Sequence, residues 1–186
     1  SLDIASDDYS FDIFTQVATA VGPNRDTVGE DPLSGLEVKH VVGQGASQSA
    51  GRLATYVNAI APLNQAFDGF ILTIYFGRGT SLEVGDTVVN INAPQAGSVQ
   101  QRLQGQNLLR DDLDVPVFVV NSELEAIACQ SVRQPDSDSM RFWETAGTCH
   151  VSQQGRAVRQ LLIDRDGLIS RPIQSGINAI PMNPLY

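Results

Sequence analysis

The stretch that decides the fold reads Val41-Val42-Gly43-Gln44-Gly45-Ala46-Ser47-Gln48-Ser49-Ala50-Gly51. Residues 36–42 form a β-rich run before it, and apolar residues recur at helical spacing over residues 48–60 after it. Because glycines break the run at Gly43 and Gly45, we expect the strand to end there in a tight turn, with Ser47 at its apex.

A serine on such a strained strand-to-helix turn has its hydroxyl exposed, as in a nucleophile elbow. The residues two before and two after it must be small, because the strand and helix backbones approach closely there. Gly45 and Ser49 meet this need, although Ser49 replaces the second glycine of the strict Gly-x-Ser-x-Gly pattern. The structural alternative is a small-residue turn that packs a helix on a sheet.

Strand and helix patterns alternate along the chain. Helical spacing of apolar residues predicts an amphipathic helix over residues 9–21 and, from Val99, Leu103 and Leu108 or Leu109, another helix. Apolar runs predict strands over residues 117–120 and 140–145, and a further apolar run covers residues 70–76. Val158, Leu161 and Leu162 indicate a final helix or strand. Residues 77–97 are polar and rich in turn residues, which indicates a loop or cap-like insertion. We therefore expect a single α/β domain segment over residues 1–186, with a mostly parallel sheet and flanking helices.

Composition limits the classes of partner. The 186 residues are 42% hydrophobic, which is enough for one sizeable core, and no stretch approaches the length of a membrane span. The net charge of -9 would repel a phosphate backbone, so nucleic acid is not expected as a partner.

The cysteines and histidines do not indicate a metal site or a cofactor. Cys129 and Cys149 lack Cys-x-x-Cys spacing, and His40 and His150 lie far apart in sequence. The two cysteines form one disulfide or remain free thiols, and a disulfide would indicate a secreted or periplasmic protein. The compartment is otherwise left open, and the chain is expected to be soluble.

A serine needs a base to become a nucleophile, and the base needs a third group to orient it. In an elbow-type site the chain order is serine, acid, histidine. His150 closes a small-residue turn directly after the expected strand 140–145, whereas His40 lies inside the run before the elbow and is assigned no role. The acid follows Pro116 and its apolar run: counting from that proline favours Glu125, and Glu123 is the alternative.

Three segments carry a resemblance to a known family. They are Gly45-Ala46-Ser47-Gln48-Ser49-Ala50-Gly51-Arg52-Leu53-Ala54-Thr55-Tyr56-Val57-Asn58-Ala59, Phe67-Asp68-Gly69-Phe70 and Arg141-Phe142-Trp143-Glu144-Thr145-Ala146-Gly147-Thr148-Cys149-His150. Together they resemble a poorly characterised family of α/β-hydrolase domain proteins, whose own elbow is similar to the Ser-Gln-Ser-Ala sequence here. The resemblance covers most of the chain.

The resemblance implies a serine hydrolase that acts on small-molecule esters. Ser47 would be the nucleophile, His150 the general base and Glu125 the orienting acid, while the backbone N–H of Gln48 would donate to the oxyanion. Gly77-Arg78-Gly79 also resembles a family loop in which Arg78 would line the pocket, although a solvated turn is the simpler interpretation. The alternative from another class is a catalytically silent, hydrolase-like binding or assembly module.

The position of the elbow leads to one more expectation. In this fold several strands precede the elbow, yet here only one helical pattern and one turn do, and residues 178–186 resemble the lead-in to a final helix. We therefore expect that the chain is the C-terminal part of the fold, and that a partner chain or flanking segments complete the sheet and supply the second oxyanion donor. An elbow strand without such a neighbour would expose an unpaired edge.

Overall fold

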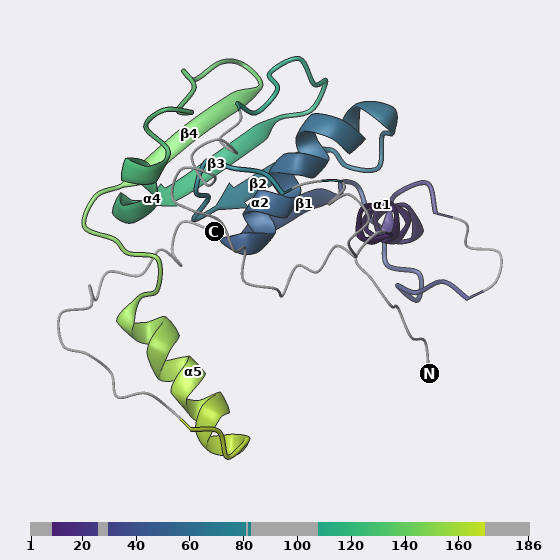
Figure 1. Ribbon diagram of the computed structural model, residues 1–186. Helices are drawn as coiled ribbons and strands as arrows, with labels where there is room; N and C mark the ends of the chain where they lie inside the picture. The colour runs from purple at the N-terminus through teal and green to yellow at the C-terminus, as the bar shows by residue number, and fades with distance from the viewer. Residues whose placement is uncertain (1–8, 26–29, 81, 83–107, 170–186) are drawn as a thin grey trace.

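A computed structural model describes residues 9–25, 30–80, 82 and 108–169. Its centre is a four-stranded sheet in the order β1-β2-β3-β4. The strands are β1 (Val42–Ala46), β2 (Gly69–Thr73), β3 (Val117–Ser122) and β4 (Met140–Thr145). All neighbouring strands run parallel, so their carboxyl ends meet at one edge (Figure 1).

Helical segments connect and flank the strands. They are α1 (Ser10–Val21), α2 (Gln48–Thr55), a π-helical turn (Tyr56–Ile60), a 3-10 turn (Ala61–Leu63), α4 (Glu123–Ala128) and α5 (Gln153–Arg165). This alternation confirms the expected α/β class with a mostly parallel sheet. The segment predicted as one helix over residues 48–60 is α-helical only to Thr55 and continues as the π-helical turn.

The expected strand over residues 36–42 is wrong, because β1 begins at Val42. Gly43 and Gly45 lie within the strand and do not break it. A Cβ on Gly43 would stand 2.8 Å from the Phe70 ring, so the missing side chain lets neighbouring aromatic groups pack against the strand. The glycines are therefore packing residues of β1, and the turn itself is confined to Ser47.

The other strands follow the apolar runs. β3 and β4 cover residues 117–120 and 140–145 as expected, and β2 covers the first part of 70–76 before the chain turns at Ile74, whose φ is 45°. The final segment with Val158, Leu161 and Leu162 is helical. Residues 83–107, which include most of the expected loop 77–97 and the helix near Val99, lie outside the described residues, as do residues 178–186.

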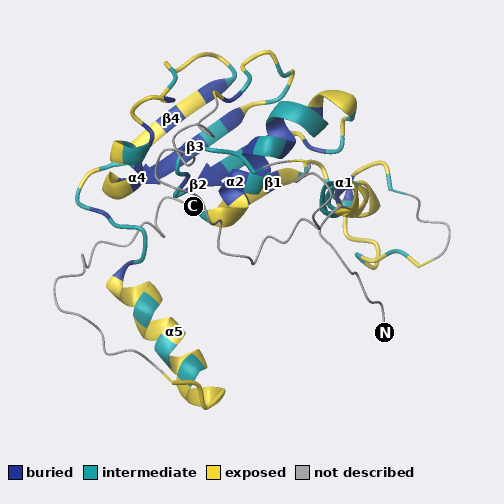
Figure 2. Ribbon diagram, in the orientation of Figure 1, coloured by how far each residue is buried: buried dark blue, intermediate teal, exposed yellow. Residues whose placement is uncertain are grey.

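The core lies on one face of the sheet. Buried apolar side chains of the strands pack with buried residues of α2 and with an aromatic cluster formed by Phe14, Tyr56, Phe67 and Phe70. In Figure 2 the buried parts of the ribbon are concentrated on the strands and on α2. α1 reaches this cluster through Phe14, which stacks on Phe67 at a centroid distance of 4.7 Å. α2 begins directly after Ser47 at the carboxyl end of β1, whereas the aromatic cluster lies near the amino end of β2, which pairs with the start of β1.

Among the described residues, two elements, β1 and α5, are more exposed than the rest of the fold. β1 is the end strand of the sheet and pairs only with β2, and alternate β1 residues, among them Val42, are exposed. α5 projects away from the sheet and has no buried residue (Figures 1 and 2). That a partner chain or further segment completes the sheet stays a prediction.

Candidate active site

Ser47 lies at the carboxyl end of β1, where the chain enters α2. Its φ of 56° and ψ of -116° are strained for a residue with a side chain, as in serines on sharp strand-to-helix turns. The Ser47 N–H donates to the Thr73 carbonyl at 3.0 Å, and the Thr73 hydroxyl donates to the Gly45 carbonyl at 3.2 Å. The end of β2 therefore holds the strained turn in place.

The two small residues around Ser47, Gly45 and Ser49, differ in how much room the structure leaves for a side chain. A Cβ on Gly45 would stand 2.5 Å from the Ser49 carbonyl oxygen, so this position requires glycine. Ser49 is exposed, and its hydroxymethyl group extends to solvent. The departure from the strict Gly-x-Ser-x-Gly pattern is thus sterically tolerated.

His150 follows β4 and reaches the serine from the next loop. Its Nε2 lies 2.9 Å from the Ser47 Oγ, although the two residues are 103 positions apart in sequence. The Thr148 hydroxyl donates to the Thr145 carbonyl at 2.6 Å, and Gly147 has a φ of 74°, so a tight turn aims the imidazole back at the sheet edge. The Phe76 ring packs on the imidazole at a centroid distance of 5.2 Å.

Glu125 lies on the far side of the imidazole, in α4. Its side chain is fully buried, and its Oε1 lies 2.7 Å from the His150 Nδ1. Since a carboxylate only accepts hydrogen bonds, Nδ1 carries the proton of the neutral imidazole and Nε2 is left to accept from Ser47. The three side chains therefore form one hydrogen-bonded line from Ser47 to Glu125.

Glu123 has a different partner. Its Oε2 accepts a 2.7 Å hydrogen bond from the backbone N–H of Gly147, in the loop that carries His150. Residues two apart on a helix do not face the same way, so Glu123 and Glu125 cannot both reach one imidazole. The structure thus brings Glu125 to His150 and leaves Glu123 on the exposed side of the turn.

Gln48 is the first residue of α2, directly after the serine. This is the position that supplies an oxyanion-hole N–H in elbow-type sites. His40 lies away from the Ser47 region, exposed beside Asp68 at 3.6 Å.

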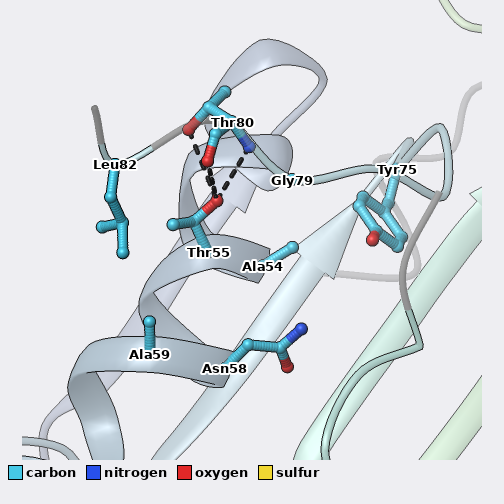
Figure 3. Close-up of a pocket in the computed structure, with 8 residues that line it drawn as sticks. All are labelled: Ala54, Thr55, Asn58, Ala59, Tyr75, Gly79, Thr80 and Leu82. Carbon is cyan, nitrogen blue, oxygen red and sulfur yellow. Dashed lines mark hydrogen bonds between the residues drawn. The ribbon is translucent and has the colours of Figure 1, made fainter. Parts of the chain in front are cut away.

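A small cavity of about 210 Å³ lies beside α2 (Figure 3). It is lined by Ala54, Thr55, Asn58, Ala59, Tyr75, Gly79, Thr80 and Leu82. The Thr55 hydroxyl donates to the Thr80 carbonyl at 2.6 Å and accepts from the Thr80 N–H at 2.8 Å, which ties the segment after β2 to α2. Arg78 is not among the lining residues: its carbonyl lies over Gly51 of α2. A pocket role for its side chain stays a prediction.

A buried polar cluster supports the segment between β2 and Phe76. The Asn121 side chain accepts from the Tyr75 N–H at 2.8 Å and donates to the Tyr75 carbonyl at 3.1 Å. The Cys129 thiol donates to the same carbonyl at 2.9 Å, and burial raises its pKa to about 12. Burial also raises the pKa of the Tyr75 phenol, whose oxygen has no hydrogen-bond partner among the described residues.

No disulfide joins Cys129 and Cys149, so the bond that would have indicated secretion is not formed. Within the described part of the chain, no group of three or more histidine, cysteine or acidic side chains could hold a metal ion. None of the described helices is both long and apolar enough to span a membrane.

The residues that support the three central side chains were not predicted from the sequence. Thr73 and Asn121 gave no local signal, because their hydrogen-bond partners, Gly45 and Tyr75, are 28 and 46 positions away in sequence. Ser122 did give one: Ser122-Glu123-Leu124-Glu125 has the Ser-x-x-Glu spacing of a capping box, and the structure contains that box at the start of α4.

A serine on a strand-to-helix turn, an acid after a later strand and a histidine after another follow the chain order of α/β hydrolases, here on a parallel sheet. The chain belongs to the alpha/beta hydrolase domain family, whose family model matches residues 1–186. No curated protein and no solved structure matches it. Membership of this family indicates a hydrolase.

Proposed function

We propose that the chain is a serine hydrolase that cleaves carboxylic esters through an acyl-enzyme, with Ser47 as nucleophile, His150 as general base and Glu125 as orienting acid. The observation that supports this most is the hydrogen-bonded line in which Ser47 Oγ lies 2.9 Å from His150 Nε2, and His150 Nδ1 lies 2.7 Å from Glu125 Oε1. Incidental serine, histidine and glutamate side chains from three separate segments need not converge in this order.

In the first half-reaction Ser47 Oγ attacks the ester carbonyl carbon while its proton passes to His150 Nε2. The backbone N–H of Gln48 donates to the developing oxyanion. When the tetrahedral intermediate collapses, the bond to the alcohol oxygen breaks and His150 gives its proton to the leaving alcohol. Glu125, fully buried, stabilises the imidazolium that exists between these two transfers.

The second half-reaction repeats these steps with water. His150 takes a proton from the water as it attacks the acyl carbon, and returns that proton to Ser47 Oγ as the carboxylic acid leaves. Each turnover consumes one ester and one water and leaves the protein unchanged.

A fluorophosphonate probe tests this proposal, since it reacts with a serine only when a base activates the hydroxyl. We expect the wild-type chain to be labelled, and Ser47→Ala and His150→Gln to remain unlabelled. The exposed Ser49 provides the matched control, because Ser49→Ala removes a neighbouring hydroxyl and should leave labelling intact. Labelling that persists in Ser47→Ala would refute the assignment of the nucleophile.

Hydrolysis of p-nitrophenyl acetate and p-nitrophenyl butyrate tests the ester class. We expect Ser47-dependent release of p-nitrophenol with an initial burst, because acylation releases the alcohol before water attacks. A labelled protein that hydrolyses thioesters or amides but no ester would keep the serine mechanism and overturn the proposed substrate.

A further inference from the structure

The carboxylate of Glu125 is held by two separate residues, one on each oxygen. Oε1 faces the His150 Nδ1 at 2.7 Å, whereas Oε2 accepts from the Ser122 N–H at 3.3 Å and from the Ser122 hydroxyl. Ser122 and Glu125 are both fully buried. Among the described residues, two of the three hydrogen bonds to this buried carboxylate therefore come from Ser122.

Backbone geometry explains why Ser122 can do this. Ser122 ends β3 and is the N-cap of α4, and Glu125 is the third residue of that helix. In a capping box the glutamate side chain folds back onto the N-cap residue. Here the same fold-back leaves Oε1 free to face the imidazole, so the helix start also sets the orientation of the carboxylate.

Burial makes these hydrogen bonds necessary. A carboxylate removed from water is costly unless donors surround it. Without the Ser122 hydroxyl, Oε2 would keep only the longer contact to the Ser122 N–H, and the carboxylate could rotate away from His150. The neighbouring Glu123 cannot replace the donor, because a carboxylate only accepts hydrogen bonds, here from the Gly147 N–H.

We infer that Ser122 is a positioning residue of the active site, which acts on the reaction through Glu125 and does not touch the substrate. This inference rests on the proposed function above. It predicts that Ser122→Ala lowers kcat by about 10- to 100-fold, the range for a hydrogen bond to a charged group, and leaves KM nearly unchanged.

A double-mutant cycle separates positioning from a merely structural role. We compare the wild-type chain, Ser122→Ala, Glu125→Gln and the double variant, using labelling rates and p-nitrophenyl ester hydrolysis. If Ser122 acts through Glu125, Ser122→Ala costs little in the Glu125→Gln background. The inference is overturned if Ser122→Ala lowers kcat equally in the wild-type and Glu125→Gln backgrounds, or if Ser122→Ala keeps wild-type kcat.

Two further variants separate the loss of the Ser122 donor from a loss of folding. Ser122→Cys keeps the shape of the side chain and replaces a strong O–H donor by a weak S–H donor, so kcat should fall although the chain folds. Ser137→Ala is the matched control: Ser137 accepts from the Met140 N–H at 3.1 Å at the opposite end of β4 from His150, and its loss should leave kcat unchanged. Wild-type kcat in a folded Ser122→Cys would also overturn the inference.

A last measurement is independent of turnover. The imidazole Nδ1 proton of His150, hydrogen-bonded to a carboxylate, should give a low-field proton resonance that is lost in Glu125→Gln. We expect this resonance to shift or broaden in Ser122→Ala and to stay unchanged in Ser137→Ala. If the wild-type chain is never labelled, the proposed function fails, and this resonance alone decides the role of Ser122: an unshifted signal in Ser122→Ala overturns it.

Discussion

The two glutamates at the start of α4 give the sharpest prediction, because the same substitution at each has opposite expected results. Glu125→Gln replaces a carboxylate that accepts on both oxygens by an amide that accepts on one side and donates on the other. His150 donates to one side and Ser122 donates to the other. The amide must therefore place its NH2 group against a donor, whichever way it is turned.

The magnitude follows from the lost charge. Two unit charges 4 Å apart interact by about 4 kcal/mol at an effective dielectric constant of about 20. Since about 1.4 kcal/mol corresponds to a tenfold change in rate, loss of the negative charge that stabilises the imidazolium should lower kcat about 1,000-fold. In Glu123→Gln the amide oxygen can still accept from the Gly147 N–H, so kcat should stay within about twofold of wild type.

The assay is initial-rate hydrolysis of p-nitrophenyl butyrate, together with the fluorophosphonate labelling rate. Circular dichroism and thermal unfolding confirm that each variant is folded. If Glu123→Gln loses as much activity as Glu125→Gln, or if Glu125→Gln keeps more than a tenth of wild-type kcat, the assignment of the acid is refuted.

Three further predictions concern the elbow and the buried cluster. Gly45→Ala should destabilise the fold by about 1–3 kcal/mol in urea unfolding, because its Cβ would meet the Ser49 carbonyl at 2.5 Å, and an unchanged midpoint would contradict this. Ser49→Gly, which restores the strict motif, should leave kcat within about twofold and destabilise α2 by less than about 1 kcal/mol, as rates and unfolding midpoints can show. Because burial raises the pKa of Cys129 from 9.0 to about 12, the folded state holds this proton more tightly, so the free energy of unfolding should fall between about pH 9 and pH 12. Urea unfolding at pH 8 and pH 10.5 checks this, and Cys129→Ala should reduce the slope.

The sequence by itself determined the class of the fold and the order in which the candidate serine, acid and histidine follow one another along the chain. Alternating apolar runs predict strands and helices because burial of one face imposes a local period on the chain. Small residues on both sides of Ser47 indicated the strained turn, and a histidine after a later strand indicated the base. These signals are readable because each depends on residues close together in sequence.

Only the tertiary structure decided the rest. The strand before Ser47 was predicted too early, because Gly43 and Gly45 act as turn residues locally, whereas Phe70 packs over Gly43 in the fold. Which of Glu125 and Glu123 contacts His150 depends on the direction in which each side chain leaves α4 and on where the His150 loop passes. Contacts between residues as far apart as 47 and 150 follow from strand order and register, which no local pattern contains.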